Sequence, residues 1–410
     1  MSQPRNRRRL RAAVLAPLAV LALVLSACGA QEDSKAGDHE GSHAEHEAKP
    51  SPTETADAAH DHAGAAALGK RTPLRAGERR VNVRMPKAYT PSAPTGTGTD
   101  DYRCFLLDPK VPTDQFITGF DIKPGNPEVV HHVILFRVPA DLVAQAEQKD
   151  AGTPGQGWTC FGASGLGRGA GGIDDAPWVG AWAPGGSEQV YGKGFGEELG
   201  KGSRVVMQVH YNLLAGKQPD RSGAQLRLAP VSDDIKPLET RLLPAPVEMP
   251  CRPEYSGGKL CSRPAALKDV KKRFGQEPGS MADVLHFLCG EVKAGPVQSC
   301  TQTVTRPETV RGVAGHMHLL GRSIKLEVNP GESDARTILD IPMWDFDNQA
   351  SRSIKPEALE PGDKLKVTCR HEQSLRDQLP SFKGQPDKYV LWGDGTTDEM
   401  CLGIMLVTRP

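Results

Sequence analysis

The sequence has no excess of charge of either sign, because 50 lysine and arginine residues balance 50 aspartate and glutamate residues. It also lacks a basic stripe with interleaved aromatic residues, so nothing favours nucleic-acid binding. No CxxC pair occurs among its nine cysteines, which removes local support for a thiolate zinc site or a thioredoxin-like redox motif. Helical periodicity is scarce, and residues 139–148 are one candidate helix, with a proline at the start.

The N-terminal apolar run is too short to span a bilayer comfortably, and it is interrupted by Pro17. It follows an arginine-rich segment and ends in Leu25-Ser26-Ala27-Cys28, which resembles a bacterial lipobox. We therefore expect residues 1–28 to be a lipoprotein signal peptide, exported by the general or the twin-arginine route. Lipidated Cys28 would then hold the protein at the outer face of the cytoplasmic membrane. An ordinary secretory signal with a chance cysteine is the alternative.

Export gives the remaining cysteines a structural role. Setting Cys28 aside from the nine leaves eight, and an even number in an oxidising compartment predicts up to four disulfides. Cys251, Cys261, Cys289 and Cys300 allow three pairings among themselves. Proximity in sequence favours Cys251 with Cys261 and Cys289 with Cys300.

Residues 29–78 are rich in Ala, Glu, His, Asp and Pro and have almost no large apolar residues. Such a segment cannot bury enough surface to offset its chain entropy, so we expect a disordered stalk. Its histidines are His39, His43, His46, His60 and His62. They could capture metal ions or belong to a solvated spacer, and composition does not decide between the two.

After the stalk, short runs rich in Val, Ile, Leu and Phe alternate with Gly, Pro and Asp. The runs are RVNVRM, FITGFDI, VVHHVILFRV, SRVVMQVHYNLL, SIKLEV, KLKVTC and CLGIMLV. Short strands separated by turn residues predict an all-β protein with two antiparallel, jelly-roll-like β-sandwich domains, residues 79–230 and 231–410. A Pro- and Gly-rich insertion at about 231–300 separates the two sandwiches.

Histidines occur at three places on these strands: His131-His132, His210, and His316 with His318. Residues i and i+2 of a strand share a face, so His316 and His318 could bind one metal ion. Adjacent residues of a strand point to opposite faces, so His131 and His132 could bind one metal ion only with local twist or a β-bulge. Taken singly, each group is more often solvated or hydrogen-bonded than bound to metal.

Five motifs around these histidines stand in an order typical of one family. They are Asp101-Tyr102-Arg103-Cys104, Val130-His131-His132-Val133-Ile134-Leu135-Phe136, Gln208-Val209-His210-Tyr211, His316-Met317-His318-Leu319-Leu320-Gly321-Arg322 and Asp398-Glu399-Met400-Cys401. Together they resemble the copper type II, ascorbate-dependent monooxygenases, the family of peptidylglycine α-hydroxylating monooxygenase and dopamine β-monooxygenase. The resemblance runs from about residue 80 to the C-terminus and weakens between 231 and 300.

The resemblance implies two copper ions and a small reductant such as ascorbate. His131, His132 and His210 would bind the electron-transferring copper, with Tyr102 and Gln208 close behind it. His316, His318 and Met400 would bind the copper that activates dioxygen for C–H hydroxylation. A thioether is a soft ligand that favours Cu(I) and adds little to zinc binding, so Met400 favours a copper site over the zinc site of a hydrolase. The family also implies disulfides Cys104–Cys160 and Cys369–Cys401.

Departures from the family concern the substrate. Where the peptidylglycine enzyme has a carboxylate-binding arginine this chain has Ala314, and Ile404 replaces a helpful tyrosine. Asp345 and Asp347 are weak candidates for binding an amine, and acidic turn residues are the simpler interpretation. We expect His286 and His371 to be surface or hydrogen-bonded histidines.

The substrate, a small molecule or a peptide, stays open, and we expect a monomer. A non-catalytic copper-binding or copper-delivery lipoprotein is the main alternative function. A zinc protein that uses only three histidines is a weaker one.

Overall fold

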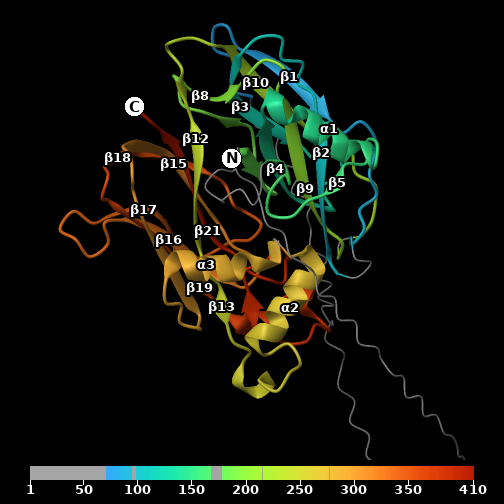
Figure 1. Ribbon diagram of the computed structural model, residues 1–410, viewed down its shortest axis with the longest axis vertical. Coiled ribbons are helices and arrows are strands. Elements are labelled where there is room, and N and C mark those ends of the chain that lie inside the picture. The colour runs from blue at the N-terminus through green and yellow to red at the C-terminus, as the bar shows by residue number, and fades with distance from the viewer. Residues whose placement is uncertain (1–70, 95–97, 168–177, 215, 277) are drawn as a thin grey trace, which may run out of the picture. The chain divides into compact units, whose positions relative to one another are not determined.

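Strands dominate the protein and form two pairs of sheets, as Figure 1 shows. The structure is a computed structural model, and it describes residues 71–410 except 95–97, 168–177, 215 and 277. All of the described residues belong to one compact unit, residues 60–410. The expected signal peptide, Cys28 and the stalk histidines lie outside the described residues. The all-β prediction is confirmed.

The first pair of sheets is built from residues 79–237. One sheet contains β1 (Arg79–Arg84), β10 (Gly223–Pro230), β3 (Gln115–Lys123), β8 (Phe195–Leu199) and β11 (Lys236–Pro237) in spatial order, with β7 (Gln189–Val190) also paired to β3. The other contains β5 (Trp158–Thr159), β2 (Asp100–Leu107), β9 (Arg204–Asn212), β4 (Val130–Val138) and β6 (Trp178–Trp182). All pairings are antiparallel except that of β11 with β8.

Alternation along β9 shows how the first pair is packed. Val205, Met207, Val209 and Tyr211 join the apolar core between the two sheets. Val206, Gln208 and His210 therefore lie on the opposite face. Val206 belongs to a second apolar cluster, which also contains residues of the C-terminal half of the chain. The five-stranded sheet is thus buried on both faces.

The second pair of sheets is built from residues 239–408. One sheet has the order β12 (Glu239–Ala245), β21 (Cys401–Thr408), β15 (Glu308–His316) and β18 (Arg352–Leu359). The other has the order β14 (Val297–Thr303), β19 (Lys364–His371), β16 (Gly321–Val328) and β17 (Arg336–Ile341). A short pair, β13 (Glu248–Met249) with β20 (Val390–Leu391), lies beside them.

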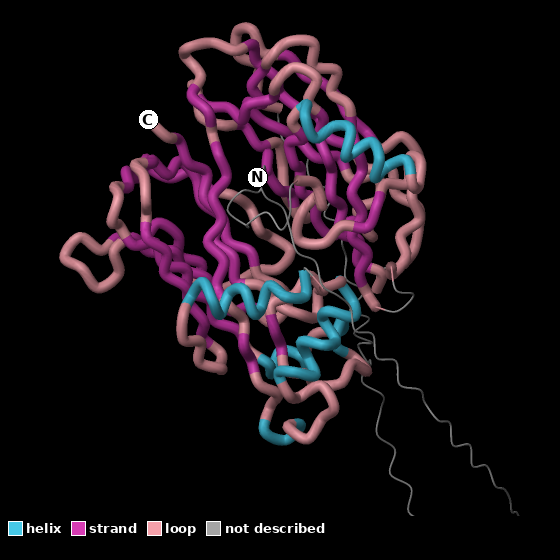
Figure 2. Tube along the Cα trace, viewed as in Figure 1, coloured by secondary structure: helices cyan, strands magenta, loops and turns pink. Residues whose placement is uncertain are grey.

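Helices are few, and Figure 2 shows them at the edges of the sheets. The candidate helix at 139–148 is present as a 3₁₀ turn, Ala140–Leu142, followed by α1 (Val143–Ala151). Two further helices, α2 (Arg263–Phe274) and α3 (Met281–Cys289), lie in the Pro- and Gly-rich insertion, where no helix was predicted. Among the described residues, no helix is long and apolar enough to cross a membrane.

Local signals explain α2. The Ser262 side chain accepts a hydrogen bond from the Ala265 amide, and a proline occupies the first turn. Three basic residues fill the last turn, and Gly275 ends the helix with a positive φ of 95°. These signals are present in the sequence, but they are outweighed there by the many Pro and Gly residues around them.

All four expected disulfides are formed. Cys104–Cys160 joins β2 to the segment after β5, and Cys369–Cys401 joins β19 to β21. Cys251–Cys261 and Cys289–Cys300 close short loops, with sequence separations of 10 and 11. The second of these ties the end of α3 to β14, so the insertion is fastened to the second pair of sheets.

The folded region begins before residue 79, which corrects the expected end of the stalk. Arg227 of β10 is 1% exposed, and its guanidinium donates to the carbonyl oxygens of Thr72 and Pro73, each at 2.9 Å. It also pairs with Glu78. A buried guanidinium needs several acceptors, and residues 72–78 supply them.

A buried ion cluster fastens α2 to the segment that precedes β21. Both carboxylate oxygens of Asp398 accept hydrogen bonds from Arg273 of α2, at 2.6 and 2.8 Å, and Lys388 donates to one of them. Burial alone would raise the pKa of Asp398, but Arg273 and Lys388 outweigh it and hold that pKa well below its usual range. Asp398 is therefore ionised at neutral pH.

Replacing this carboxylate should destabilise the protein strongly. Asp398→Asn leaves Lys388 without its carboxylate and Arg273 with Asp269 alone, both largely buried, and we expect the free energy of unfolding to fall by about 3 kcal/mol. The matched control is Asp377→Asn, which removes an exposed partner of Arg252 and should cost less than about 1 kcal/mol. Urea unfolding with the disulfides intact measures both. Equal losses would contradict a stabilising role for the cluster.

Candidate metal centre

A register shift between β4 and β9 brings adjacent histidines to one side of the sheet. Val130 lies opposite Tyr211 and His132 opposite His210, so His131 is the extra residue of a β-bulge. This irregularity is the one that a shared site for His131 and His132 requires. The two histidines and His210 lie together, at 7%, 8% and 1% exposure.

The three imidazoles converge through their Nδ1 atoms. The Nδ1–Nδ1 distances are 3.1 Å between His131 and His132, 3.3 Å between His131 and His210, and 3.2 Å between His132 and His210. The centre of such a triangle is about 1.9 Å from each nitrogen, close to the ~2.0–2.1 Å of a metal–imidazole bond. This group could hold a metal ion.

Asp100 orients one of these imidazoles. Its Oδ1 accepts a hydrogen bond from Nε2 of His210 at 2.8 Å, which assigns the proton to Nε2 and leaves the Nδ1 lone pair for a metal. Burial would raise the pKa of Asp100, but hydrogen bonds from His210, Thr396 and Thr99 lower it to about 2. Asp100 was not predicted from the sequence, because its approach to His210 depends on the pairing of β2 with β9.

The two residues expected behind this group differ in their contacts. The Tyr102 ring stacks on His210 with centroids 4.0 Å apart, and its hydroxyl donates to the Asp394 carbonyl at 2.6 Å. The Gln208 amide nitrogen instead donates to the Ala163 carbonyl at 3.3 Å. Tyr102 therefore touches a histidine of the group, while Gln208 supports the neighbouring loop.

His316 and His318 form a second pair, with ring centroids 5.1 Å apart. Nδ1 of His316 donates to Gln349 Oε1 at 2.6 Å, and Nδ1 of His318 lies 3.3 Å from the Asp398 carbonyl oxygen. Both rings thus have Nε2 left as the acceptor nitrogen. Nε2 of His318 is buried and has no hydrogen-bond partner among the described residues. An unpaired buried imidazole nitrogen is what a metal ligand presents before the metal binds.

Met400 lies close in register to this pair. His316 is opposite Leu402 across β15 and β21, and the same register continued by two residues puts His318 level with Met400. The buried Glu399 carboxylate accepts hydrogen bonds from the backbone N–H groups of His318 and Met400, at 2.9 and 3.2 Å. His371, fully buried, donates to the Met400 carbonyl at 3.3 Å. Neither Glu399 nor His371 was predicted to act here.

The two histidine groups approach each other. The rings of His132 and His316 are 5.8 Å apart. Phe346 stacks on His131 at 4.3 Å and lies 6.4 Å from His318. Phe346 comes from the segment considered for Asp345 and Asp347, both of which are exposed, and Asp345 accepts the Asp347 amide in a turn.

Burial lowers the pKa of four of these histidines and so favours their neutral form. It lowers the pKa of His131 and His132 well below the usual range, and nearby imidazoles lower it further. Burial also lowers the pKa of His318, and it lowers that of His316 to about 3. Neutral imidazole is the form that binds metal, so protons compete weakly at pH 7.

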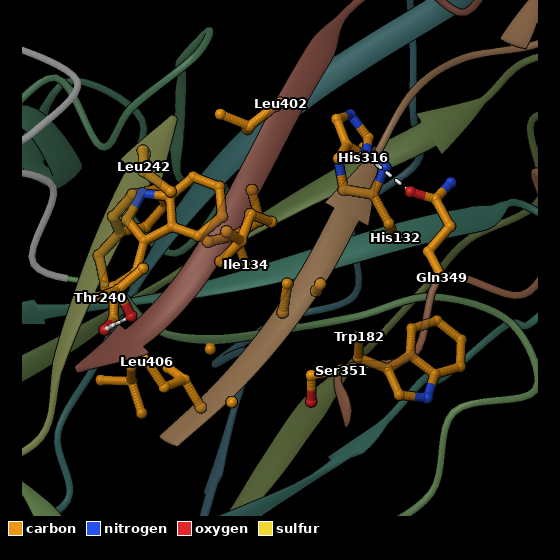
Figure 3. Close-up of a pocket in the computed structure, with 18 of the residues that line it drawn as sticks. His132, Ile134, Trp182, Thr240, Leu242, His316, Gln349, Ser351, Leu402 and Leu406 are labelled. Carbon is orange, nitrogen blue, oxygen red and sulfur yellow. Dashed lines mark hydrogen bonds between the residues drawn. The ribbon is translucent and has the colours of Figure 1, made fainter. Parts of the chain in front are cut away.

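A cavity of about 590 Å³ borders both groups. His132, His316 and Met400 line it, and Tyr102 and Gln208 do so as well. In Figure 3, His132 and His316 lie near each other, Gln349 points toward His316, and Leu242, Ile134 and Leu406 lie further away. Ala314 and Ile404, the two departures from the family, are opposite each other in β15 and β21 and both line the cavity.

Comparisons with known proteins add no family. No family model and no curated protein matches the chain. Among solved structures, PNGF-II has a TM-score of 0.35 and 9% identity over 81% of this chain and 66% of that chain, just under two thirds of its length. The fucolectin of striped bass (Morone saxatilis) serum has a TM-score of 0.18 and 8% identity, over 82% and 97% of the two chains. Likenesses this weak carry no argument.

Lowering the pH from 7 to 5 should destabilise the metal-free protein. Histidines of the unfolded chain, with a pKa near 6.5, take up protons in this range, whereas buried His131, His132 and His316 have a pKa far enough below it to stay neutral. Each then reduces the free energy of unfolding by about 1.4 kcal/mol per pH unit once the pH is below the unfolded pKa. Urea unfolding at pH 7, 6 and 5 measures this, and His316→Gln should show a smaller loss. Stability that rises toward pH 5 would contradict it.

Asp100→Asn should weaken metal binding to the three-histidine group by roughly 10–100-fold, because the neutral amide holds His210 less firmly and polarises it less. Competition with a chromophoric chelator measures the affinity for copper. Asp121→Asn is the control, since Asp121 is equally buried but lies on β3 and pairs with Lys123. Unchanged affinity in the Asp100 variant would show that this carboxylate does not orient a ligand.

Proposed function

We propose that the protein is a copper-dependent monooxygenase that hydroxylates a C–H bond. The overall reaction would combine substrate R–H, dioxygen, two electrons and two protons to give R–OH and water. Ascorbate or a similar small reductant would supply the electrons. Cys28 would tether the protein outside the cytoplasmic membrane, which agrees with the oxidised state of the four disulfides.

One observation supports this proposal: the three-histidine group, which could hold a metal ion, and the second group of His316, His318 and Met400 both border one cavity. The three-histidine group offers nitrogen alone, whereas the second group would add the thioether of Met400 to the imidazoles of His316 and His318. Imidazole suits copper in both oxidation states, and the thioether favours Cu(I). Bound copper would supply electron transfer at the first group and dioxygen activation at the second.

The residues of the chain perform the supporting tasks. Asp100 and Gln349 fix the ring orientations of His210 and His316 through hydrogen bonds at 2.8 and 2.6 Å. Glu399 holds the backbones of His318 and Met400 together, so the nitrogen and sulfur donors keep their spacing. The apolar walls of the cavity limit water beside the donors, which protects a reactive oxygen species from side reactions.

A copper carrier remains the competing function, and turnover separates the two. Copper-loaded protein that consumes dioxygen with ascorbate, and does so faster with an organic substrate that gains one oxygen atom, is an enzyme. Rapid transfer of copper to an acceptor protein, without any oxygenated product, would favour the carrier. Burial of the histidines supports the enzyme, because a delivery site needs an exposed path for exchange.

Met400→Ala should abolish product formation while the three-histidine group keeps its copper. We expect the copper content to fall from two ions to about one per chain, because the second group loses its soft donor. Metal analysis together with mass spectrometry of the product measures both effects. Met343→Ala is the control, since Met343 is 79% exposed. Wild-type turnover in the Met400 variant would refute the assignment of the oxygen-activating group.

A further inference from the structure

The strands around the cavity form rows that lead away from the histidines. In the first row, Pro244, Leu402 and His316 are neighbours across β12, β21 and β15. The next row on the same face is Leu242, Ile404 and Ala314. The third is Thr240, Leu406 and Gly312. The surface next to the metal-binding end is therefore apolar throughout the second row, and in the third row Thr240 is the polar residue.

The wall of the cavity formed by β4 and β6 is also apolar. Ile134 and Phe136 follow His132 on the outward face of β4, and Trp178 and Trp182 come from β6. Ile134, Phe136 and Trp178 belong to the same apolar cluster as Leu242 and Leu402. A molecule in this part of the cavity would have hydrocarbon and aromatic surface on both sides.

Several polar side chains that line the cavity are already paired within the protein, whereas the buried indole Nε1 of Trp178, a neutral donor, has no hydrogen-bond partner among the described residues. The Thr240 hydroxyl donates to the Trp178 carbonyl at 3.2 Å, and the Ser351 hydroxyl donates to Gln189 at 3.0 Å. Tyr191 donates to the Val179 carbonyl. Gln349 accepts from His316, and its amide nitrogen donates to the Phe346 carbonyl at 2.7 Å. These groups therefore have little capacity to bind a charged ligand.

Three charged side chains border the cavity, and none lies in the row of Leu242, Ile404 and Ala314, although Arg311 adjoins Gly312 of the third row and Arg352 is opposite Val313. Arg311 is five residues before His316 on β15, roughly 16 Å along the strand, and its guanidinium covers Phe195 and donates to Thr408. Arg352 is exposed on β18. Asp394 lies beside Tyr102, and burial together with nearby Asp398 raises its pKa to about 7. The Asp394 carboxyl is therefore protonated in part of the molecules at pH 7.

We propose that this cavity binds a neutral, largely apolar organic molecule, and not a carboxylate or an amine. An ionised group placed against the row of Leu242, Ile404 and Ala314 would lose its hydration, and that row offers it no charged partner. That the bound molecule is the substrate, with its reacting C–H bond toward His132, His316 and Met400, rests on the proposed monooxygenase function. The binding itself does not.

Three naphthalenes of similar size test the class of ligand. N-phenyl-1-naphthylamine, a neutral dye that fluoresces in apolar surroundings, is bound to the metal-free protein at pH 7 and then displaced. We expect 1-ethylnaphthalene to displace it at concentrations at least ~10-fold lower than 1-naphthylacetate or 1-naphthylmethylamine. Failure of the dye to bind would overturn the proposal. Equal or tighter binding of the anion or the amine would also do so, and a preference for the amine would point to Asp394.

Charge placed in the apolar rows locates the binding site. Ala314→Arg should raise the affinity for the 1-naphthylacetate anion, relative to that for 1-ethylnaphthalene, by at least ~10-fold, because the guanidinium can pair with the carboxylate. Ala314→Met, of similar length but neutral, should leave that ratio as in the wild type. Leu242→Lys with Leu242→Met forms a second pair, should the arginine variant fail to fold by circular dichroism. An unchanged ratio in a folded, charged variant would place the ligand elsewhere.

The ligand class and the proposed monooxygenase function can fail independently of each other. Neutral ligands that bind but are never oxygenated by the copper-loaded protein would support the ligand class and count against the monooxygenase. Copper-dependent oxygenation confined to amines or carboxylates would support the monooxygenase and overturn the ligand class.

Discussion

The five-stranded sheet β5-β2-β9-β4-β6 is buried on both faces, and the site depends on this constraint. Its inner face packs against the six-stranded sheet through Val205, Met207 and Val209. Its outer face carries His132 and His210 together with apolar residues such as Ile134, Phe136 and Val206. Exposure of this face would place a large apolar area in water. The C-terminal sheets cover that face, and the cavity is the part of the contact that side chains do not fill.

The β-bulge at His131 has meaning only in this setting. On a sheet with one solvated face, a bulge would turn one more side chain toward water. Here it turns a second imidazole into a space already enclosed by Phe346 and His316. Burial lowers the pKa of His131 and His132 and so favours their neutral form. Neutral imidazoles with converging Nδ1 atoms are suited to a metal ion.

Much of this arrangement was predictable from the sequence. The strands that carry the histidines were recognisable from their apolar alternation, and the need for local twist or a bulge at His131-His132 followed from the period of a strand. The four disulfides were also predicted, two by proximity and two by resemblance. The helices of the insertion were missed because their caps are local signals within a segment dominated by Pro and Gly. Asp100, Phe346, Gln349 and Glu399 were missed for another reason, since each acts through partners far away in sequence.

The segment from Asp394 to Met400 connects the two histidine groups physically. Thr396 donates to Asp100, which holds His210, and the Asp394 carbonyl accepts from Tyr102, which stacks on the same imidazole. A few residues later, the Asp398 carbonyl lies against His318 and Met400 lines the cavity.

This segment is itself held on three sides. Arg273 and Lys388 pair with Asp398, Glu399 receives backbone N–H groups from the His318 turn, and the Cys369–Cys401 disulfide follows directly. A displacement of the segment would therefore alter the ligand orientation at both groups together. The buried charges that seem remote from the cavity are, on this argument, part of what keeps the nitrogen group and the nitrogen–sulfur group in a fixed relation.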